Sequence, residues 1–159
     1  MKILGIDPGA RITGYGIVET TKKGTAVVAF DEIAFAKGMP ISAIMLRLHD
    51  EITKIASANA VDTIALENIF LGKSIPSFVT QAHVRGTIIL ASTMLNIRIF
   101  EYTPLEVKRA VVGYGKAEKQ QVQMMVRAIL KIDKPMSFDT SDALAIAICH
   151  ANTQKQESL

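Results

Sequence analysis

The chain has 159 residues, of which 49% are hydrophobic and 21% are charged, and its formal net charge is +3. These values are typical of a globular protein, and we expect one domain that spans residues 1–159. The single cysteine excludes an intramolecular disulfide, and no apolar run reaches the roughly 20 residues that a membrane-spanning helix needs. We therefore expect a cytoplasmic protein with no membrane contact. The slight excess of positive charge fits a nucleic-acid partner but does not establish one.

The first third of the chain has the pattern of three β-strands. They are expected over residues 2–7, 12–19 and 25–35, with a turn near Gly24 between the second and the third. Apolar residues at helical spacing then follow Pro40, so a helix should come next.

The rest of the chain alternates between strand and helix patterns. The expected elements are a strand over 61–67, a helix over 77–95, a strand over 97–102, a helix that begins at Thr103-Pro104, and helices over 117–130 and 140–151. This order predicts an α/β fold with a mixed five-stranded sheet flanked by helices, in which three antiparallel strands are followed by two parallel ones. A parallel crossover can bring the first and fourth strands side by side, which would place Asp7 and Glu67 together at one end of the sheet.

Four carboxylates, Asp7, Glu67, Asp139 and Asp142, lie at the polar edges of apolar segments. Asp7 and Glu67 end short apolar runs typical of buried strands. Asp139 and Asp142 open an alanine-rich stretch and, three residues apart, share one face at the start of a helix. Brought together, such groups would repel one another unless cations lay between them. Because Mg²⁺ and Mn²⁺ prefer oxygen ligands, the sequence predicts a divalent metal site.

Each of these acids also has a purely structural interpretation. Asp7 precedes Pro8-Gly9 in a good turn sequence, Glu67 fits a solvated strand end, and Asp139 fits a helix cap. For Asp7 alone the turn interpretation is the stronger one. Only the joint pattern of the acids favours a metal site over these alternatives.

Two glycine-containing segments lack a residue that nucleotide-binding motifs require. Gly72-Lys73-Ser74 would need a glycine where Glu67 stands to form a phosphate-binding loop. Residues 113–115 (Gly-Tyr-Gly) would need one where Glu118 stands to form a dinucleotide-binding loop. Both interpretations are therefore rejected.

Basic residues instead gather around the second of these segments. They are Lys108, Arg109, Lys116 and Lys119, which we expect to bind DNA phosphates. Lys73 is either a further phosphate contact or an ordinary surface lysine. We expect the glycines of the second strand and of residues 113–115 to let a DNA backbone approach closely and to leave amides free for phosphate oxygens.

Several other side chains have two interpretations. Phe70 lies just after Glu67 between two large apolar residues, which favours an exposed wedge that stacks on a base over a plain core residue. Cys149 and the pair Met124-Met125 are expected in the core. His49 and His150 are expected to be ordinary helix residues, whereas His83 is a candidate contact to DNA or to a second copy of the chain.

A small-residue pair also marks the expected helix over 77–95. Ala82 and Gly86 lie four residues apart, which permits the close approach of another helix. The approaching helix could belong to the same chain or to a second copy. We favour a contact between two copies of the chain, and so a homodimer.

Four groups of motifs occur in order along nearly the whole chain. They are residues 5–9 (Gly-Ile-Asp-Pro-Gly) with 13–16 (Thr-Gly-Tyr-Gly), Glu67 followed by Phe70, residues 111–119 (Val-Val-Gly-Tyr-Gly-Lys-Ala-Glu-Lys), and residues 139–145 (Asp-Thr-Ser-Asp-Ala-Leu-Ala). Together they resemble the ribonuclease H-like nucleases and, more narrowly, the RuvC family of bacterial Holliday-junction resolvases.

The resemblance implies a magnesium-dependent endonuclease that works as a homodimer on four-way DNA junctions in homologous recombination and DNA repair. It implies symmetric paired nicks by two-metal-ion hydrolysis, with two Mg²⁺ ions per active site that Mn²⁺ can replace. It also implies two partners, the junction-binding protein RuvA and the branch-migration protein RuvB.

Residue by residue, the resemblance assigns roles to the motif positions. The four acids correspond to catalytic metal ligands, and Lys108 and Lys119 to lysines near the cleaved phosphate. Phe70 corresponds to an aromatic residue that stacks on an opened base at the junction centre. Lysines so placed would stabilise the negative charge that grows on the phosphate during cleavage.

Three alternative functions stay open from the sequence. Actin-like and sugar-kinase ATPases share an aspartate and glycine near an N-terminal strand pair, but they need a second domain that 159 residues do not supply. A non-catalytic junction-binding protein would have no use for Asp139 and Asp142 beside Asp7 and Glu67. A ribonuclease H proper is nearer, and the Phe70 loop with the glycine–lysine segment favours branched DNA over it.

Overall fold

The computed structural model describes residues 1–68 and 74–157. In these residues the elements follow the order β1-β2-β3-α1-β4-α2-β5-α3-α4-α5, as predicted. The strands are β1 (Lys2–Asp7), β2 (Ile12–Thr21), β3 (Gly24–Ala34), β4 (Thr63–Glu67) and β5 (Arg98–Tyr102). The helices are α1 (Ile41–Asn59), α2 (Ile75–Met94), α3 (Pro104–Val112), α4 (Lys119–Leu130) and α5 (Phe138–Glu157).

The strands form one mixed sheet in the order β3-β2-β1-β4-β5, with β1 at its centre. The strand pairs β1–β2 and β2–β3 are antiparallel, whereas β1–β4 and β4–β5 are parallel. The predicted ribonuclease H-like arrangement is therefore confirmed. Ile6 pairs with Leu66, so the residues that follow them, Asp7 and Glu67, end neighbouring strands at the same edge of the sheet.

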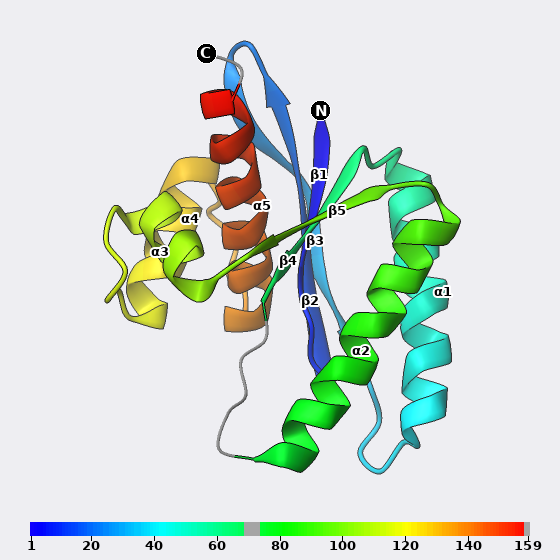
Figure 1. The fold of residues 1–159 in the computed structure, drawn as a ribbon. Coiled ribbons are helices and arrows are strands. Elements are labelled where there is room, and N and C mark those ends of the chain that lie inside the picture. Colours follow the sequence, from blue (N-terminus) through cyan, green and yellow to red (C-terminus); the bar gives the residue numbers. More distant parts are fainter. Residues whose placement is uncertain (69–73, 158–159) are drawn as a thin grey trace.

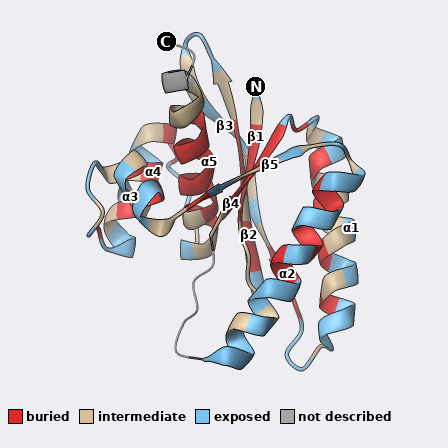
Figure 2. Cartoon of the chain, in the orientation of Figure 1, coloured by how far each residue is buried: buried red, intermediate tan, exposed pale blue. Residues whose placement is uncertain are grey.

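Helices cover both faces of this sheet, α1 and α2 on one side and α3, α4 and α5 on the other (Figure 1). The alternation of side chains along β1 divides the core between the two faces. Leu4 and Ile6 pack toward α1 and α2, and Ile3 packs toward α5. Asp7 therefore lies on the α5 side, and Figure 2 shows that the inner surfaces of the helices hold the buried residues.

Glycines in β1 and β2 let α5 lie directly on the sheet. A Cβ atom at Gly5 would lie 2.1 Å from the carbonyl oxygen of Ala143, and one at Gly14 would lie 2.2 Å from that of Asp139. Gly14 pairs with Asp7 in the sheet. The first turn of α5 is thus held over the end of β1. This corrects the expectation that the strand glycines make room for DNA, because helix packing fills that space.

Capping hydrogen bonds decide where two helices begin. The Ser74 hydroxyl accepts a hydrogen bond from the Ser77 amide, so α2 begins at Ile75, two residues before the expected start. The Ser137 hydroxyl accepts one from the amide of Thr140 at 3.2 Å, so α5 begins at Phe138. Ser137, and not Asp139, therefore caps α5, which corrects the structural alternative considered for that aspartate.

The core predictions are confirmed in part. Cys149 is buried, as expected. Met125 is half-buried and packs against the core, but Met124 is 65% exposed, so its expected core role is wrong. The buried face of α4 is formed by Val122, Val126 and Leu130 instead. Within the described residues, no helix combines the length and the apolar character that crossing a membrane requires.

Candidate active site

Asp7 lies at the centre of an acidic group that three separate elements supply. It ends β1 between the last residue of β4, Glu67, and its β2 partner Gly14. Asp139 and Asp142 come from the first turns of α5, which pack closely on the sheet at Gly14. The structure thus brings the four predicted acids into one neighbourhood, although Asp7 and Asp139 are more than 130 positions apart in the sequence.

The pKa of Asp7 reflects its interaction with the other three acids. Its pKa is raised from the ordinary 3.8 to about 8, first by burial and then by the charges of Asp142, Glu67 and Asp139. Lys119 opposes this shift but does not cancel it. A buried carboxyl among like charges gains from any cation that binds beside it.

Glu67 and Asp142 behave in the same way as Asp7. The pKa of each is raised, mainly by burial, while Lys119 and Lys108 oppose the shift. The Lys119 ammonium lies 3.2 Å from the Asp142 carboxylate and donates a hydrogen bond to it, and this contact raises the pKa of Lys119. Two of the predicted basic residues therefore act directly on the acids.

The acids interact but do not form a ready-made ligand shell. Among the described residues, no three acidic, histidine or cysteine side chains are close enough together to hold a metal ion as they stand. Asp142 is occupied by its ion pair with Lys119. Binding a metal would therefore require carboxylate side chains to turn toward it, while the strands and α5 already hold their main chains in place.

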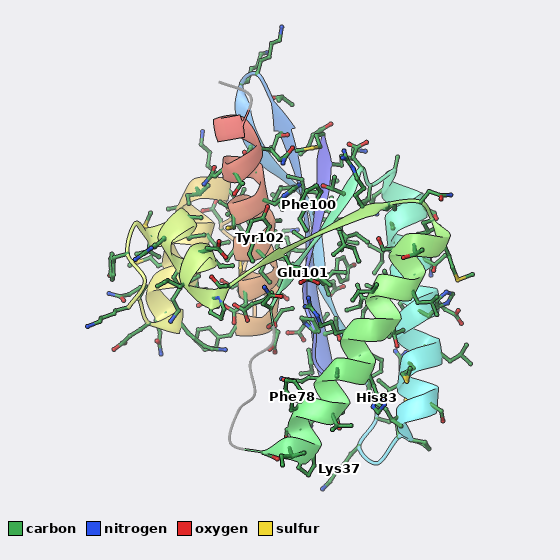
Figure 3. The ribbon with its side chains drawn as sticks, viewed as in Figure 1. Lys37, Phe78, His83, Phe100, Glu101 and Tyr102 are labelled. Atoms are coloured by element: carbon green, nitrogen blue, oxygen red, sulfur yellow. The ribbon has the colours of Figure 1, made fainter. Side chains whose placement is uncertain are left out.

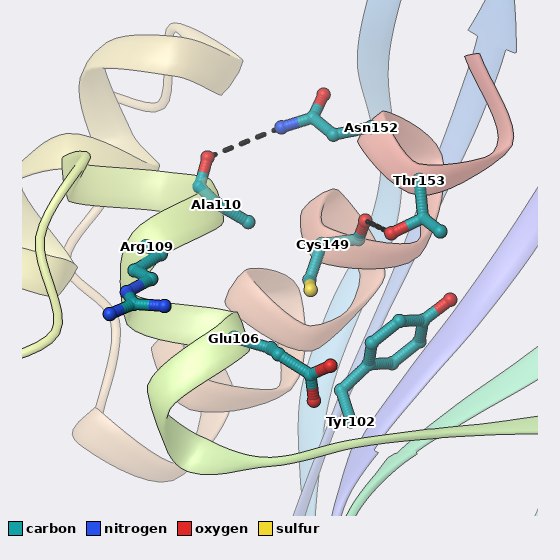
Figure 4. Close-up of a pocket in the computed structure, with 7 residues that line it drawn as sticks. All are labelled: Tyr102, Glu106, Arg109, Ala110, Cys149, Asn152 and Thr153. Atoms are coloured by element: carbon teal, nitrogen blue, oxygen red, sulfur yellow. Dashed lines mark hydrogen bonds between the residues drawn. The ribbon is translucent and has the colours of Figure 1, made fainter. Parts of the chain in front are cut away.

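The other predicted basic residues are distributed differently. Arg109 lines a separate cavity of about 640 Å³ between α3 and α5, together with Glu106 and Cys149 (Figure 4). Lys116 is exposed in the turn between α3 and α4. Phe70 and Lys73 lie outside the described residues, so their DNA-binding roles stay predictions.

A second groove, of about 650 Å³, opens beside Asp139. One wall is the turn after β1, with Gly9 and Arg11, and the other is the first part of α2. The α2 wall presents neutral hydrogen-bonding side chains, among them Thr80 and Gln81. Because Asp139 is also among the lining residues, the groove adjoins the acidic group.

The outward side of α2 is apolar and exposed. We call this surface the α2 outer face; it consists of Ile75, Val79, Ala82, Gly86, Ile89, Leu90 and Met94. A Cβ atom added at Gly86 would meet no atom of the described residues within 4 Å, so the part of the chain that the structure describes leaves the space above it open. The small-residue pair noted in the sequence thus faces outward and is not packed against another of the described helices. His83 is exposed on the same helix (Figure 3).

Arg85, which is buried on α2, was not predicted from the sequence. Its side chain is buried and donates to the main-chain oxygen of Glu67 at 2.6 Å and to the Asn68 side chain at 3.3 Å. It also forms an ion pair with Glu101 of β5. No sequence signal points to these contacts, because an arginine in a helix is ordinary and its partners lie on two strands.

Comparison with known proteins identifies the family of this chain. A family model described as crossover junction endodeoxyribonuclease RuvC matches residues 3–150. The chain belongs to the RuvC family. It is 44% identical to the RuvC of Ruminiclostridium cellulolyticum over 160 residues, which cover 100% of this chain and 96% of the relative. It is 43% identical to the RuvC of Geotalea uraniireducens over 157 residues, which cover 96% and 90% of the two chains.

Solved RuvC structures share the fold described above. Thermus thermophilus RuvC matches with a TM-score of 0.90 and 27% identity, over 99% of this chain and 97% of that protein. The structure of T. thermophilus RuvC with its Holliday junction substrate matches with a TM-score of 0.89 and 23% identity, over 98% and 96% of the two chains. The mixed sheet with a helical layer on each side is therefore the RuvC architecture.

Proposed function

We propose that this protein is an endonuclease that resolves four-way DNA junctions by paired, symmetric nicks in homologous recombination and DNA repair. Membership of the RuvC family supports the activity. The observation that carries the site is the buried Asp7, whose pKa is raised to about 8 beside three further carboxylates and a lysine. Such an arrangement costs the folded protein stability, which a function for the charges would explain.

We propose Mg²⁺ as the cofactor, with two ions per site and Mn²⁺ as a substitute. The donor set fits these hard cations, since Asp7, Glu67, Asp139 and Asp142 offer only carboxylate oxygens. When bound, the ions would activate the attacking water and stabilise the leaving oxygen of the phosphodiester. Repulsion among the acids is the force that would make cation binding favourable.

The lysines have a separate task in this proposal. Lys119 pairs with Asp142, so it is placed to turn to the substrate phosphate once a cation occupies the carboxylate. Lys108 acts on Glu67 and Asp142 from α3. Together they would stabilise the additional negative charge on the phosphate in the transition state.

The cleaved strand would reach the acids along the groove lined by Arg11, Thr80 and Gln81, which ends at Asp139. Lys116 and Lys73 would add phosphate contacts, and Phe70 would stack on an opened base at the junction centre. Arg109 would bind DNA from outside the acidic group. Junction affinity should then fall steeply with salt, because phosphate contacts release counterions.

We propose a homodimer formed through the α2 outer face. This face is apolar along the whole helix, and its small residues at 82 and 86 allow a second helix to come close. Family membership extends the proposal to RuvA and RuvB as partners and, because the substrate is chromosomal DNA, to a cytoplasmic location.

The decisive experiment compares three substrates with and without Mg²⁺. A synthetic four-way junction should be cut at symmetric positions only when Mg²⁺ is present, whereas linear duplex DNA should survive. An RNA–DNA hybrid should also survive, because a ribonuclease H proper would cut it. Cleavage of the hybrid in preference to the junction would refute the proposed substrate.

A further inference from the structure

Arg85 reaches from α2 to the point where β4 leaves the sheet. The residue is only 8% exposed, and its guanidinium donates to the main-chain oxygen of Glu67 at 2.6 Å. The same guanidinium contacts the Asn68 side chain at 3.3 Å and is paired with Glu101 on β5. Figure 3 labels Glu101 on this strand, which is the sheet edge beside α2. One buried cation thus joins a helix and two strands.

The hydrogen bond from Arg85 is made to Glu67, a residue proposed to bind metal. On its β5 side, this end of β4 is held by the main-chain amide of Asn68, which donates to the main-chain oxygen of Tyr102 at 2.8 Å. From α2, Arg85 holds Glu67 and Asn68 at this end of β4. A planar guanidinium is suited to this task because its rigid fork aims several donors in fixed directions, whereas a lysine ammonium is a compact point charge.

Simple stability does not require this arrangement. A buried ion pair is often no more stabilising than apolar residues of the same size. The hydrogen bond to Glu67, by contrast, fixes the main chain that carries one carboxylate of the acidic group. Groups that hold a metal ligand through its neighbours commonly matter for metal affinity and for rate.

We propose that Arg85 is a positioning residue for cleavage, which holds the end of β4 so that Glu67 can meet the metal beside Asp7. This role rests on the proposed nuclease function and goes beyond it, since Arg85 is buried and does not itself face the DNA. It connects α2 with the end of β4 that carries Glu67.

The test replaces Arg85 with methionine, which fills similar space without donating. Arg85→Met should lower kcat for junction cleavage by about 10–100-fold and raise the Mg²⁺ concentration needed for half-maximal rate. The KM for the junction should stay within a factor of about two of the wild-type value, because no DNA contact is lost. Without metal or DNA, hydrogen exchange at the Asn68 amide should be faster than in the wild type. Mn²⁺ affinity, measured by calorimetry, should fall.

Glu101→Gln is the matched control, because it removes the ion pair but leaves the Arg85 bond to Glu67. It should keep near wild-type kcat, Mg²⁺ requirement and Asn68 exchange. An equal loss in Glu101→Gln and Arg85→Met would overturn the proposal, since the charge pair alone would then explain the effect.

Arg85→Lys covers the case in which Arg85→Met does not fold. It keeps the charge near Glu101 but lacks the forked geometry, so its kcat should still fall. A folded Arg85→Lys or Arg85→Met protein with wild-type kcat and Mg²⁺ requirement would overturn the positioning role alone. If the wild-type protein did not cut junctions at all, the proposed function would fail, while the exchange and Mn²⁺ measurements would still test the contact.

Discussion

At the scale of single residues, Asp7 shows a conflict between stability and chemistry. Burial and three neighbouring carboxylates raise its pKa to about 8, so at neutral pH the metal-free protein holds a proton there that the unfolded chain has released. Because the folded state binds more protons between pH 4 and pH 8, its stability should decrease as the pH rises through that range. A cation would reverse this loss, and its affinity should therefore increase with pH.

Asp7→Asn should separate these two effects. It should abolish Mg²⁺-dependent cleavage but leave junction binding largely intact, as measured by mobility shift. In metal-free buffer at pH 8 it should gain at least about 1 kcal/mol, or about 2–4 °C in Tm, whereas near pH 4 the difference should vanish because both side chains are neutral.

Thermal melts of wild type and Asp7→Asn from pH 4 to pH 9, with and without Mg²⁺, check this expectation. Asp133→Asn, which changes an exposed carboxylate before α5, serves as the control and should follow the wild type. A metal-free Asp7→Asn protein that melts lower than the wild type at pH 8 would contradict the electrostatic account.

At the scale of elements, the active site depends on how closely α5 lies on the sheet. A Cβ atom at Gly14 would meet the main chain of Asp139, which cannot move without shifting the helix, whereas one at Gly16 would meet mainly the side chain of Leu144, with the Leu144 Cα 3.3 Å away. Both glycines lie in β2, two residues apart, and both face α5. The two positions therefore form a matched pair for testing how precisely the acids must be placed.

Gly14→Ala should push the start of α5 away from β1. Overpacking of this kind costs about 1–3 kcal/mol, and a displacement of about 1 Å at a catalytic group can cost about 100-fold in rate. Gly16→Ala should be milder in both respects, because its two closest contacts are side-chain atoms of Leu144 and not main chain. Melting temperatures and single-turnover cleavage rates measure the two effects, and equal activity in the two variants would show that the seating of α5 does not control the site.

The sequence predicted the order of elements because strands and helices have different hydrophobic periods. It also indicated the four acids as candidate metal ligands, since each lies where such a segment meets solvent. It could not predict that Gly14 lies under Asp139, or that Arg85 reaches Glu67, because these contacts depend on how the elements pack. Met124 was misplaced for a related reason: apolar spacing along a helix does not say which residue turns toward the core.

At the scale of the whole molecule, the α2 outer face is the feature that a single chain leaves unexplained. The helix buries one side against α1 and the sheet, yet its opposite side is apolar over its full length. A two-fold axis across this face would bring two copies of α2 together and set two acidic groups in one particle. Two symmetric nicks on a junction could then occur in one encounter with the DNA.

Leu90→Glu should break this pairing without unfolding the chain. Leu90 is 56% exposed in one copy, so the new charge is solvated in the monomer but would be buried without a partner in the dimer. Sedimentation velocity at micromolar concentration should give a dimer for the wild type and a monomer for the variant. On a supercoiled plasmid with an extruded cruciform, the wild type should produce linear DNA from paired nicks, whereas Leu90→Glu should mainly produce nicked circles.

Leu46→Glu provides the control, because Leu46 is 65% exposed on α1 and lies outside the α2 outer face. It should remain dimeric and should still linearise the plasmid, which excludes a general effect of the added charge. If Leu90→Glu stayed dimeric, the contact between copies would lie elsewhere on the molecule. If it became monomeric but still cut both strands together, paired nicking would not depend on two linked active sites.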